Sequence, residues 1–97
     1  MKVQRPQPGG TAQSVAGRDK GRYYLILSAE GEALLLADGH YRPVSRPKRK
    51  NGKHVRLLPV FWPELASAAS EGKDVNSEVR ARLLHLARER GAAGERP

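Results

Sequence analysis

The sequence predicts a small, mainly β domain that is followed by one or two C-terminal α-helices. Its 97 residues fit a single domain and exclude a multidomain enzyme. Gly and Pro recur at short intervals up to Leu58, too often for long helices, whereas apolar residues after Pro63 recur at helical spacing. Only 38% of the residues are apolar and few are aromatic, so we expect a small core.

Five short strands are expected in the first part of the chain, near residues 11–15, 22–28, 32–37, 40–44 and 54–58. The second and third strands are rich in Leu and Tyr and are joined at Glu30-Gly31, which is typical of a hairpin turn. Asp38-Gly39 repeats this signal, because both residue types tolerate the positive φ angles of tight turns. The sequence therefore predicts an antiparallel meander.

Neither the second nor the third strand alternates between apolar and polar residues, so both faces of the sheet need cover. Closure into a barrel would cover one face, and helices at residues 63–71 and 76–90 would cover the other. Pro63 suits a first helical position, and Asn76 can cap the second helix, whose apolar stripe is Val79, Leu83, Leu86 and Ala87. We expect a flexible arm at residues 1–10, the barrel at 11–60, the helical extension at 61–90 and a disordered tail at 91–97.

Several classes of function are disfavoured by what the chain lacks. No apolar run of 18 residues and no signal peptide is visible, and without cysteine there is no disulfide, thiolate zinc site or cysteine nucleophile. His40, His54 and His85 have no partner at metal-ligand spacing, and Asp38, His40 and Ser45 lack the motifs around a hydrolytic triad. We therefore expect a cytoplasmic protein with no metal, no cofactor and no enzymatic activity.

The positive charge is concentrated in the first 60 residues, which hold twelve basic and four acidic side chains, whereas residues 61–97 hold six of each. Residues 40–56 contain seven Lys and Arg side chains and no carboxylate: Arg42, Arg46, Lys48, Arg49, Lys50, Lys53 and Arg56. Such a segment favours a polyanionic partner, of which nucleic acid is the commonest in cytoplasm and an anionic membrane surface is the rival. A basic face that is merely solvated explains an isolated run equally well.

A short motif narrows these alternatives. The segment Ala16-Gly17-Arg18-Asp19-Lys20-Gly21-Arg22 has two glycines that permit a tight bend, with three cations between and beside them. It resembles the first loop of the KOW-motif family of RNA-binding proteins. Downstream, Ala37-Asp38-Gly39, the basic stretch 46–50 and Asn51-Gly52-Lys53-His54-Val55 follow in the order found in KOW-domain proteins of the archaeal and eukaryotic large ribosomal subunit and in their short bacterial relatives. The resemblance covers residues 8–59.

The resemblance implies a five-stranded SH3-like barrel, of the KOW or translation-protein type, that binds structured RNA, usually ribosomal RNA. Gly17 and Gly21 would shape the first loop, and Tyr23 and Tyr41 either stack on unpaired bases or fill the core. The residues that the resemblance and the basic run assign to RNA contact are Arg18, Lys20 and Arg22 in the first loop, and Arg42, Arg46, Lys48, Arg49, Lys50, Lys53 and His54 in the second segment.

The sequence thus predicts a non-enzymatic, monomeric RNA-binding protein, ribosomal-protein-like and ribosome-associated. The alternative is a protein-interaction module of a ribosome- or transcription-associated factor that uses its C-terminal helices. Binding to a membrane surface is the weakest hypothesis, because the last helix lacks bulky aromatic residues.

Overall fold

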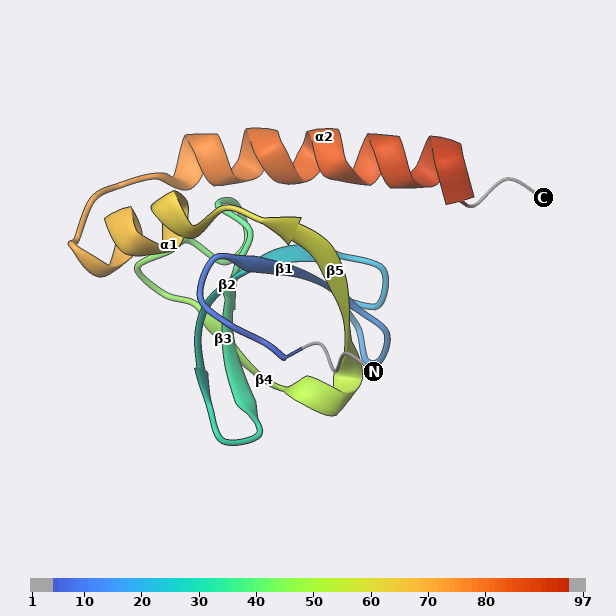
Figure 1. Cartoon of the computed structure of the whole chain (residues 1–97), viewed down its shortest axis with the longest axis horizontal. Helices are drawn as coiled ribbons and strands as arrows, with labels where there is room; N and C mark the ends of the chain where they lie inside the picture. The colour runs from blue at the N-terminus through green and yellow to red at the C-terminus, as the bar shows by residue number, and fades with distance from the viewer. Residues whose placement is uncertain (1–4, 95–97) are drawn as a thin grey trace.

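The computed structural model describes residues 5–94, which form one antiparallel sheet and two helices (Figure 1). The elements are β1 (Gly10–Ser14), β2 (Tyr23–Glu30), β3 (Ala33–Ala37), β4 (Lys48–Asn51), the 3₁₀ turn η1 (Gly52–His54), β5 (Val55–Phe61), α1 (Pro63–Ser70) and α2 (Asn76–Gly94). The strand order is β4-β3-β2-β1-β5, so β4 and β5 are the two edges of the sheet. The prediction of a mainly β domain with C-terminal helices is confirmed.

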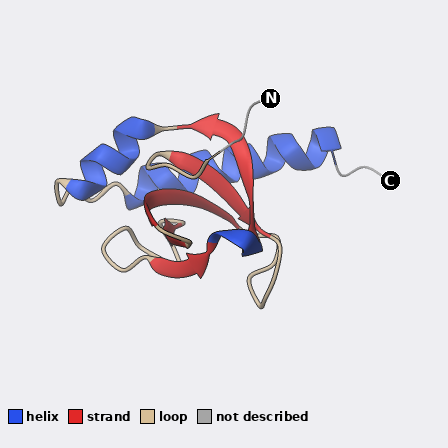
Figure 2. Cartoon of the chain, turned by 60° about the horizontal axis from the view of Figure 1, so that its bottom comes forward, coloured by secondary structure: helices blue, strands red, loops and turns tan. Residues whose placement is uncertain are grey.

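The sheet is strongly curled (Figure 2). Each of its faces carries a separate apolar cluster. The inner cluster is formed by Ala12, Tyr24, Ile26, Leu34 and Leu36. The outer cluster packs Leu25 and Leu58 of the sheet against the helices, which contribute Leu65, Val79, Leu83 and Leu86. Both faces are therefore covered, the outer one by the helices as their apolar stripe predicted.

Local chemistry explains the bounds of α1, and a tertiary contact holds the start of α2. Pro63 occupies the first position of α1, and Gly72, at φ 85°, follows its C-terminal end. Asn76 was expected to cap α2, but it is the first residue of the helix, and its side-chain oxygen accepts a hydrogen bond from the Val44 amide at 2.8 Å instead. This contact fixes α2 to the loop between β3 and β4. The helix continues through Gly91 to Gly94, into the segment that was expected to be a disordered tail.

The strand predicted at residues 40–44 is wrong, and the basic stretch that follows it forms β4 instead. The Asp38 carboxylate accepts hydrogen bonds from the amides of His40 and Arg42, both at 2.8 Å, which turns the chain away from the sheet. Pro43 and Pro47 then offer no amide for a strand ladder. Pairing with β3 resumes at Lys48, opposite Leu36.

The N-terminal part of the sheet also starts earlier than expected. β1 begins at Gly10, because Gly9 donates a backbone hydrogen bond to Ile26 and accepts one from Trp62. Gly9 has φ 90°, and a Cβ there would lie 2.5 Å from the Cα of Pro63. Part of the predicted arm is thus fixed between β2 and α1, while residues 1–4 lie outside the described residues.

Neither helix in the described part of the chain combines the length and the apolar character that crossing a bilayer requires.

Candidate nucleic-acid interface

The β1–β2 loop turns one acidic side chain inward and leaves its neighbours outside. Gly17 and Gly21 have φ of 86° and 95°, as a loop-shaping role requires. Backbone hydrogen bonds from Gly21 to Ser14 and from Arg22 to Asp19 close the loop. Its cationic side chains at positions 18 and 20 are exposed, whereas Asp19 is 6% exposed.

Four side chains donate hydrogen bonds to the Asp19 carboxylate. Oδ1 accepts from the Ser14 hydroxyl at 2.8 Å and from Lys50 Nζ at 2.9 Å. Oδ2 accepts from the Tyr24 hydroxyl at 2.6 Å and from Lys48 Nζ at 3.0 Å. Both carboxylate oxygens are therefore saturated by donors, two of which carry a full positive charge.

This environment keeps Asp19 ionised. Burial alone would raise the pKa of the Asp19 carboxyl, but the hydrogen bonds donated by Tyr24, Lys50, Lys48 and Ser14 outweigh it and hold that pKa well below its usual range. Burial, together with the hydrogen bond to Asp19, raises the pKa of Tyr24 above its usual value. We call Asp19 and its four donors, Ser14, Tyr24, Lys48 and Lys50, the Asp19 cluster. Near neutral pH it contains an ionised carboxylate and a neutral phenol.

Lys48 and Lys50 reach Asp19 because successive side chains of β4 point to opposite faces of the sheet. Lys48 pairs with Leu36 and Lys50 with Leu34, so both lysines share the inner face with these buried leucines. Arg49 between them therefore faces the opposite side. The polar cluster continues the inner apolar cluster at its Ser14 and Tyr24 end.

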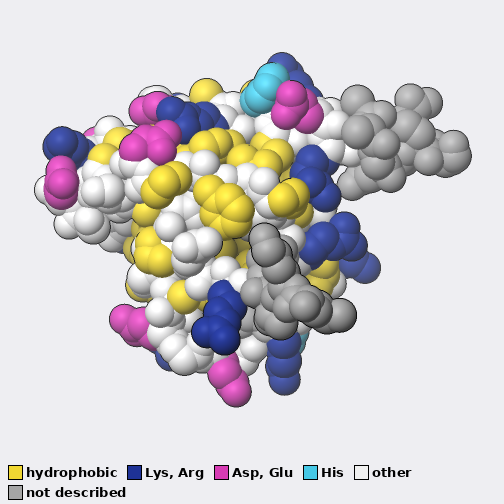
Figure 3. All heavy atoms as spheres, viewed as in Figure 1, with side chains coloured by type: hydrophobic (Ala, Val, Ile, Leu, Met, Phe, Trp, Pro, Cys, Tyr) yellow, Lys and Arg dark blue, Asp and Glu magenta, His cyan; other side chains and the backbone are white. Residues whose placement is uncertain are grey.

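The Asp19 cluster joins the two segments of the chain that were predicted to contact RNA. Lys50 Nζ also donates to the Ala16 carbonyl at 3.0 Å, and the Val15 amide donates to the His54 carbonyl at 2.9 Å. The first loop is thereby fixed against β4 and η1. We call the surface formed here by Arg18, Lys20, Lys48 and His54 the loop-end surface. Figure 3 shows Lys and Arg side chains over the β1–β2 loop with no carboxylate in view among them.

The other predicted contact residues lie in different surroundings. Arg49 shares a shallow hollow with Glu30 and Glu32. The Arg22 guanidinium lies 4.3 Å from the centre of the Tyr41 ring, near the N-terminal half of α2. Arg42 and Arg46 are exposed in the β3–β4 loop, and Tyr23 packs against the outer apolar cluster.

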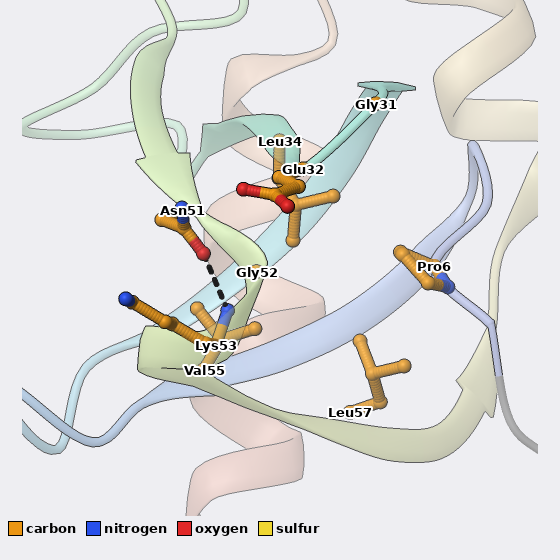
Figure 4. Close-up of a pocket in the computed structure, with 9 residues that line it drawn as sticks. All are labelled: Pro6, Gly31, Glu32, Leu34, Asn51, Gly52, Lys53, Val55 and Leu57. Atoms are coloured by element: carbon orange, nitrogen blue, oxygen red, sulfur yellow. Dashed lines mark hydrogen bonds between the residues drawn. The ribbon is translucent and has the colours of Figure 1, made fainter.

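Lys53 lines a hollow of about 530 Å³ between the β2–β3 turn, η1 and β5 (Figure 4). Leu34 and Leu57 contribute apolar side chains to it, and Glu32 also lines it. A carboxylate beside a single lysine gives this hollow no clear preference for an anion.

The residue missed by sequence reasoning is Asp19, which looked like an ordinary turn residue. The available signal was the alternation Lys48-Arg49-Lys50 beside the apolar strand Ala33–Ala37. Two lysines on the inner face of a small sheet require a buried counter-charge, and Asp19 is the acidic residue of the adjacent loop.

Among residues 5–94, no group of three or more His, Asp or Glu side chains lies close enough to hold a metal ion. Comparison with known proteins finds no family model that matches the chain and no curated protein with significant similarity to it.

Proposed function

We propose that the protein binds structured RNA through the loop-end surface. The observation that carries this proposal is the Asp19 cluster, which turns the carboxylate of the first loop inward and holds the cations beside it outward. The phosphate groups of a folded RNA would then contact Arg18, Lys20 and Lys48, whose positions are fixed before binding.

The charges of the first 60 residues support the same proposal. Asp19 is buried, Asp38 caps backbone amides, and Glu30 and Glu32 lie at the β2–β3 turn. The carboxylates are thus withdrawn from the loop-end surface, although the chain as a whole has a formal net charge of +8. Phosphates bound there would relieve the repulsion among the cations.

The kind of fold proposed is a KOW-type, SH3-like barrel. The meander order β4-β3-β2-β1-β5 and the 3₁₀ turn between the two edge strands are consistent with it. In a closed barrel, backbone hydrogen bonds join the two edge strands. At this end of the curled sheet, the ion pairs of Asp19 with Lys48 and Lys50 would instead hold β4 against the β1–β2 loop. From the KOW resemblance we propose ribosomal RNA as the ligand and the ribosome as the place of action.

The experiment compares the double variant Arg18→Gln/Lys20→Gln with the wild-type protein in binding to a hairpin RNA and to purified ribosomal RNA at several salt concentrations. Neither substituted side chain contributes to the Asp19 cluster, so we expect the fold to be retained. The logarithm of the binding constant falls as log [salt] rises, and each cation that binds a phosphate makes this slope steeper by about 0.9. The slope of the double variant should therefore be shallower by up to about 2.

The matched control is Lys73→Gln/Arg88→Gln, which removes the same charge from exposed positions outside the loop-end surface. An unchanged slope in the Arg18/Lys20 variant, or an equal decrease in the control, would contradict the proposed site. Ultraviolet crosslinking in cells tests the ligand: recovery of defined large-subunit ribosomal RNA helices is expected, and scattered fragments would argue against a ribosomal role.

A further inference from the structure

A second surface, separate from the loop-end surface, lies beside α2. A groove of about 260 Å³ opens between α2, the start of β2 and the β3–β4 loop. Tyr41 lines it from the loop, and Leu83, Leu84 and Ala87 line it from the helix. The groove is mostly apolar, yet it lies on the surface of a protein rich in charge.

Two large apolar side chains of this groove are exposed to an unusual extent. Tyr41 is 63% exposed and Leu84 is 52% exposed, and they lie on different walls of the same groove. Leu83 beside them is 5% exposed and belongs to the outer core, so Leu84 is not needed to hold α2 on the sheet. Exposed apolar side chains that gather in one groove are typical of an interaction site.

Positive charges outnumber negative charges around the groove. Arg22 and Arg80 both line it, whereas the one carboxylate among its lining residues, that of Asp38, is engaged by two backbone amides. Arg80 is fixed there by a hydrogen bond to the Gly39 carbonyl at 2.7 Å. The groove therefore combines apolar walls with a cationic rim, which complements an acidic, amphipathic ligand.

A nucleobase suits this groove less well than a peptide. The Arg22 guanidinium covers the Tyr41 ring at 4.3 Å, so one ring face is already stacked. The α2 wall is aliphatic, and the other two rings that line the groove already have contacts: His40 makes a T-shaped contact with Tyr41, with ring centres 4.3 Å apart, and Tyr23 packs against the outer apolar cluster. Apolar side chains spaced along a helix, in contrast, fit a groove beside another helix.

We propose that this groove docks an acidic amphipathic helix of a partner protein. The apolar face of the partner helix lies against Tyr41 and Leu84, and its carboxylates face Arg22 and Arg80. The protein then has two surfaces of different chemistry, one for phosphate and one for a peptide, so that binding of RNA and of the partner are compatible.

The probe is a fluorescein-labelled designed peptide of about 18 residues with Leu on one helical face and Glu on the other, measured by fluorescence anisotropy against the full chain. We expect Leu84→Ser and Tyr41→Ala to weaken binding by about tenfold or more, as hot-spot truncations do. Arg22→Gln should weaken it less and lower its salt dependence. Amide chemical shifts in NMR spectra should change at residues 22, 41 and 80–87.

The control variant is Val15→Ser, which removes an apolar side chain that is 38% exposed outside the groove and should leave peptide affinity unchanged. Far-ultraviolet circular dichroism checks that each variant is folded. Equal binding of a scrambled peptide, or binding that is insensitive to Leu84→Ser, would overturn the proposal. Single-stranded oligouridine that displaced the peptide with the same dependence on Leu84 would also overturn it, because the groove would then be a nucleotide site.

Discussion

Replacing Asp19 with Asn should destabilise the fold more than any other change of a single charge. The substitution removes a carboxylate whose side chain is 7% exposed and leaves Lys50, 10% exposed, and Lys48, 26% exposed, without their counter-charge. Removing one partner of a buried ion pair destabilises a protein by about 3–5 kcal/mol. Because Lys48 remains partly hydrated, we expect a loss of about 2–4 kcal/mol in the free energy of unfolding.

The assay is urea unfolding followed by fluorescence of the single tryptophan, Trp62, at several pH values. The pKa of Asp19 is depressed in the folded state. Its contribution to the free energy of unfolding is therefore fully present above the unfolded pKa of about 3.9 and is lost as the pH falls from that value towards the folded pKa. The Asn variant lacks this group. The difference in stability between the two proteins should therefore be largest near neutrality and shrink below about pH 5.

The control is Glu30→Gln, which removes the same charge from an exposed position and should change stability by less than about 0.5 kcal/mol. Adding Lys48→Met and Lys50→Met to the Asn variant should restore part of the loss, because the uncompensated charges are removed with them. A loss below about 1 kcal/mol for Asp19→Asn, or a loss that does not depend on pH, would refute this account of the cluster.

Three further outcomes follow from the same structure. The pKa of Tyr24 is raised in the folded state, so its contribution to the free energy of unfolding is present below the unfolded pKa of about 10 and is lost above it. The urea midpoint of the wild-type protein should therefore fall at alkaline pH, and that of Tyr24→Phe should fall less. Leu83→Ala should destabilise by about 2–5 kcal/mol in thermal or urea unfolding, whereas Leu84→Ala, one residue further along α2, should change stability by less than about 0.5 kcal/mol. Gly39→Ala should lower the melting temperature far more than Gly31→Ala, because both glycines have positive φ but only at Gly39 would a Cβ collide with backbone atoms of Asn76 and Arg80.

The parts of the fold that sequence reasoning predicted are those fixed by local chemistry. The hairpin between β2 and β3 follows from apolar runs around a glycine turn, and the start of α1 follows from Pro63. Residues 40–44 were wrongly expected to be a strand. The Asp38 side chain turns the chain there by accepting two backbone hydrogen bonds, and the sequence Asp38-Gly39 does not distinguish this turn from a tight hairpin turn. The position of β4 depends on contacts between residues about thirty positions apart, which no local pattern displays.

The candidate site shows the same division. Exposed cations such as Arg18 and Lys20 could be nominated from sequence, since charge and loop position are local properties. That Lys48 and Lys50 turn inward depends on how β4 pairs with β3, which brings both lysines to Asp19. Because charge counting treats all lysines alike, it assigned to a ligand two side chains that the fold itself uses.

This dual use determines which substitutions can test RNA binding. An ammonium group has three donors, and Lys50 directs two of them to Asp19 and the Ala16 carbonyl, so little of it is left for a phosphate. Lys48 makes one contact with Asp19 at 3.0 Å and is more exposed, so it can donate to Asp19 and to a phosphate at once. Reversing the charge at either position would disrupt the Asp19 cluster, and a loss of RNA binding would then report unfolding. Substitution of Arg18 and Lys20, which the same cluster holds outward, separates the binding surface from the fold that presents it.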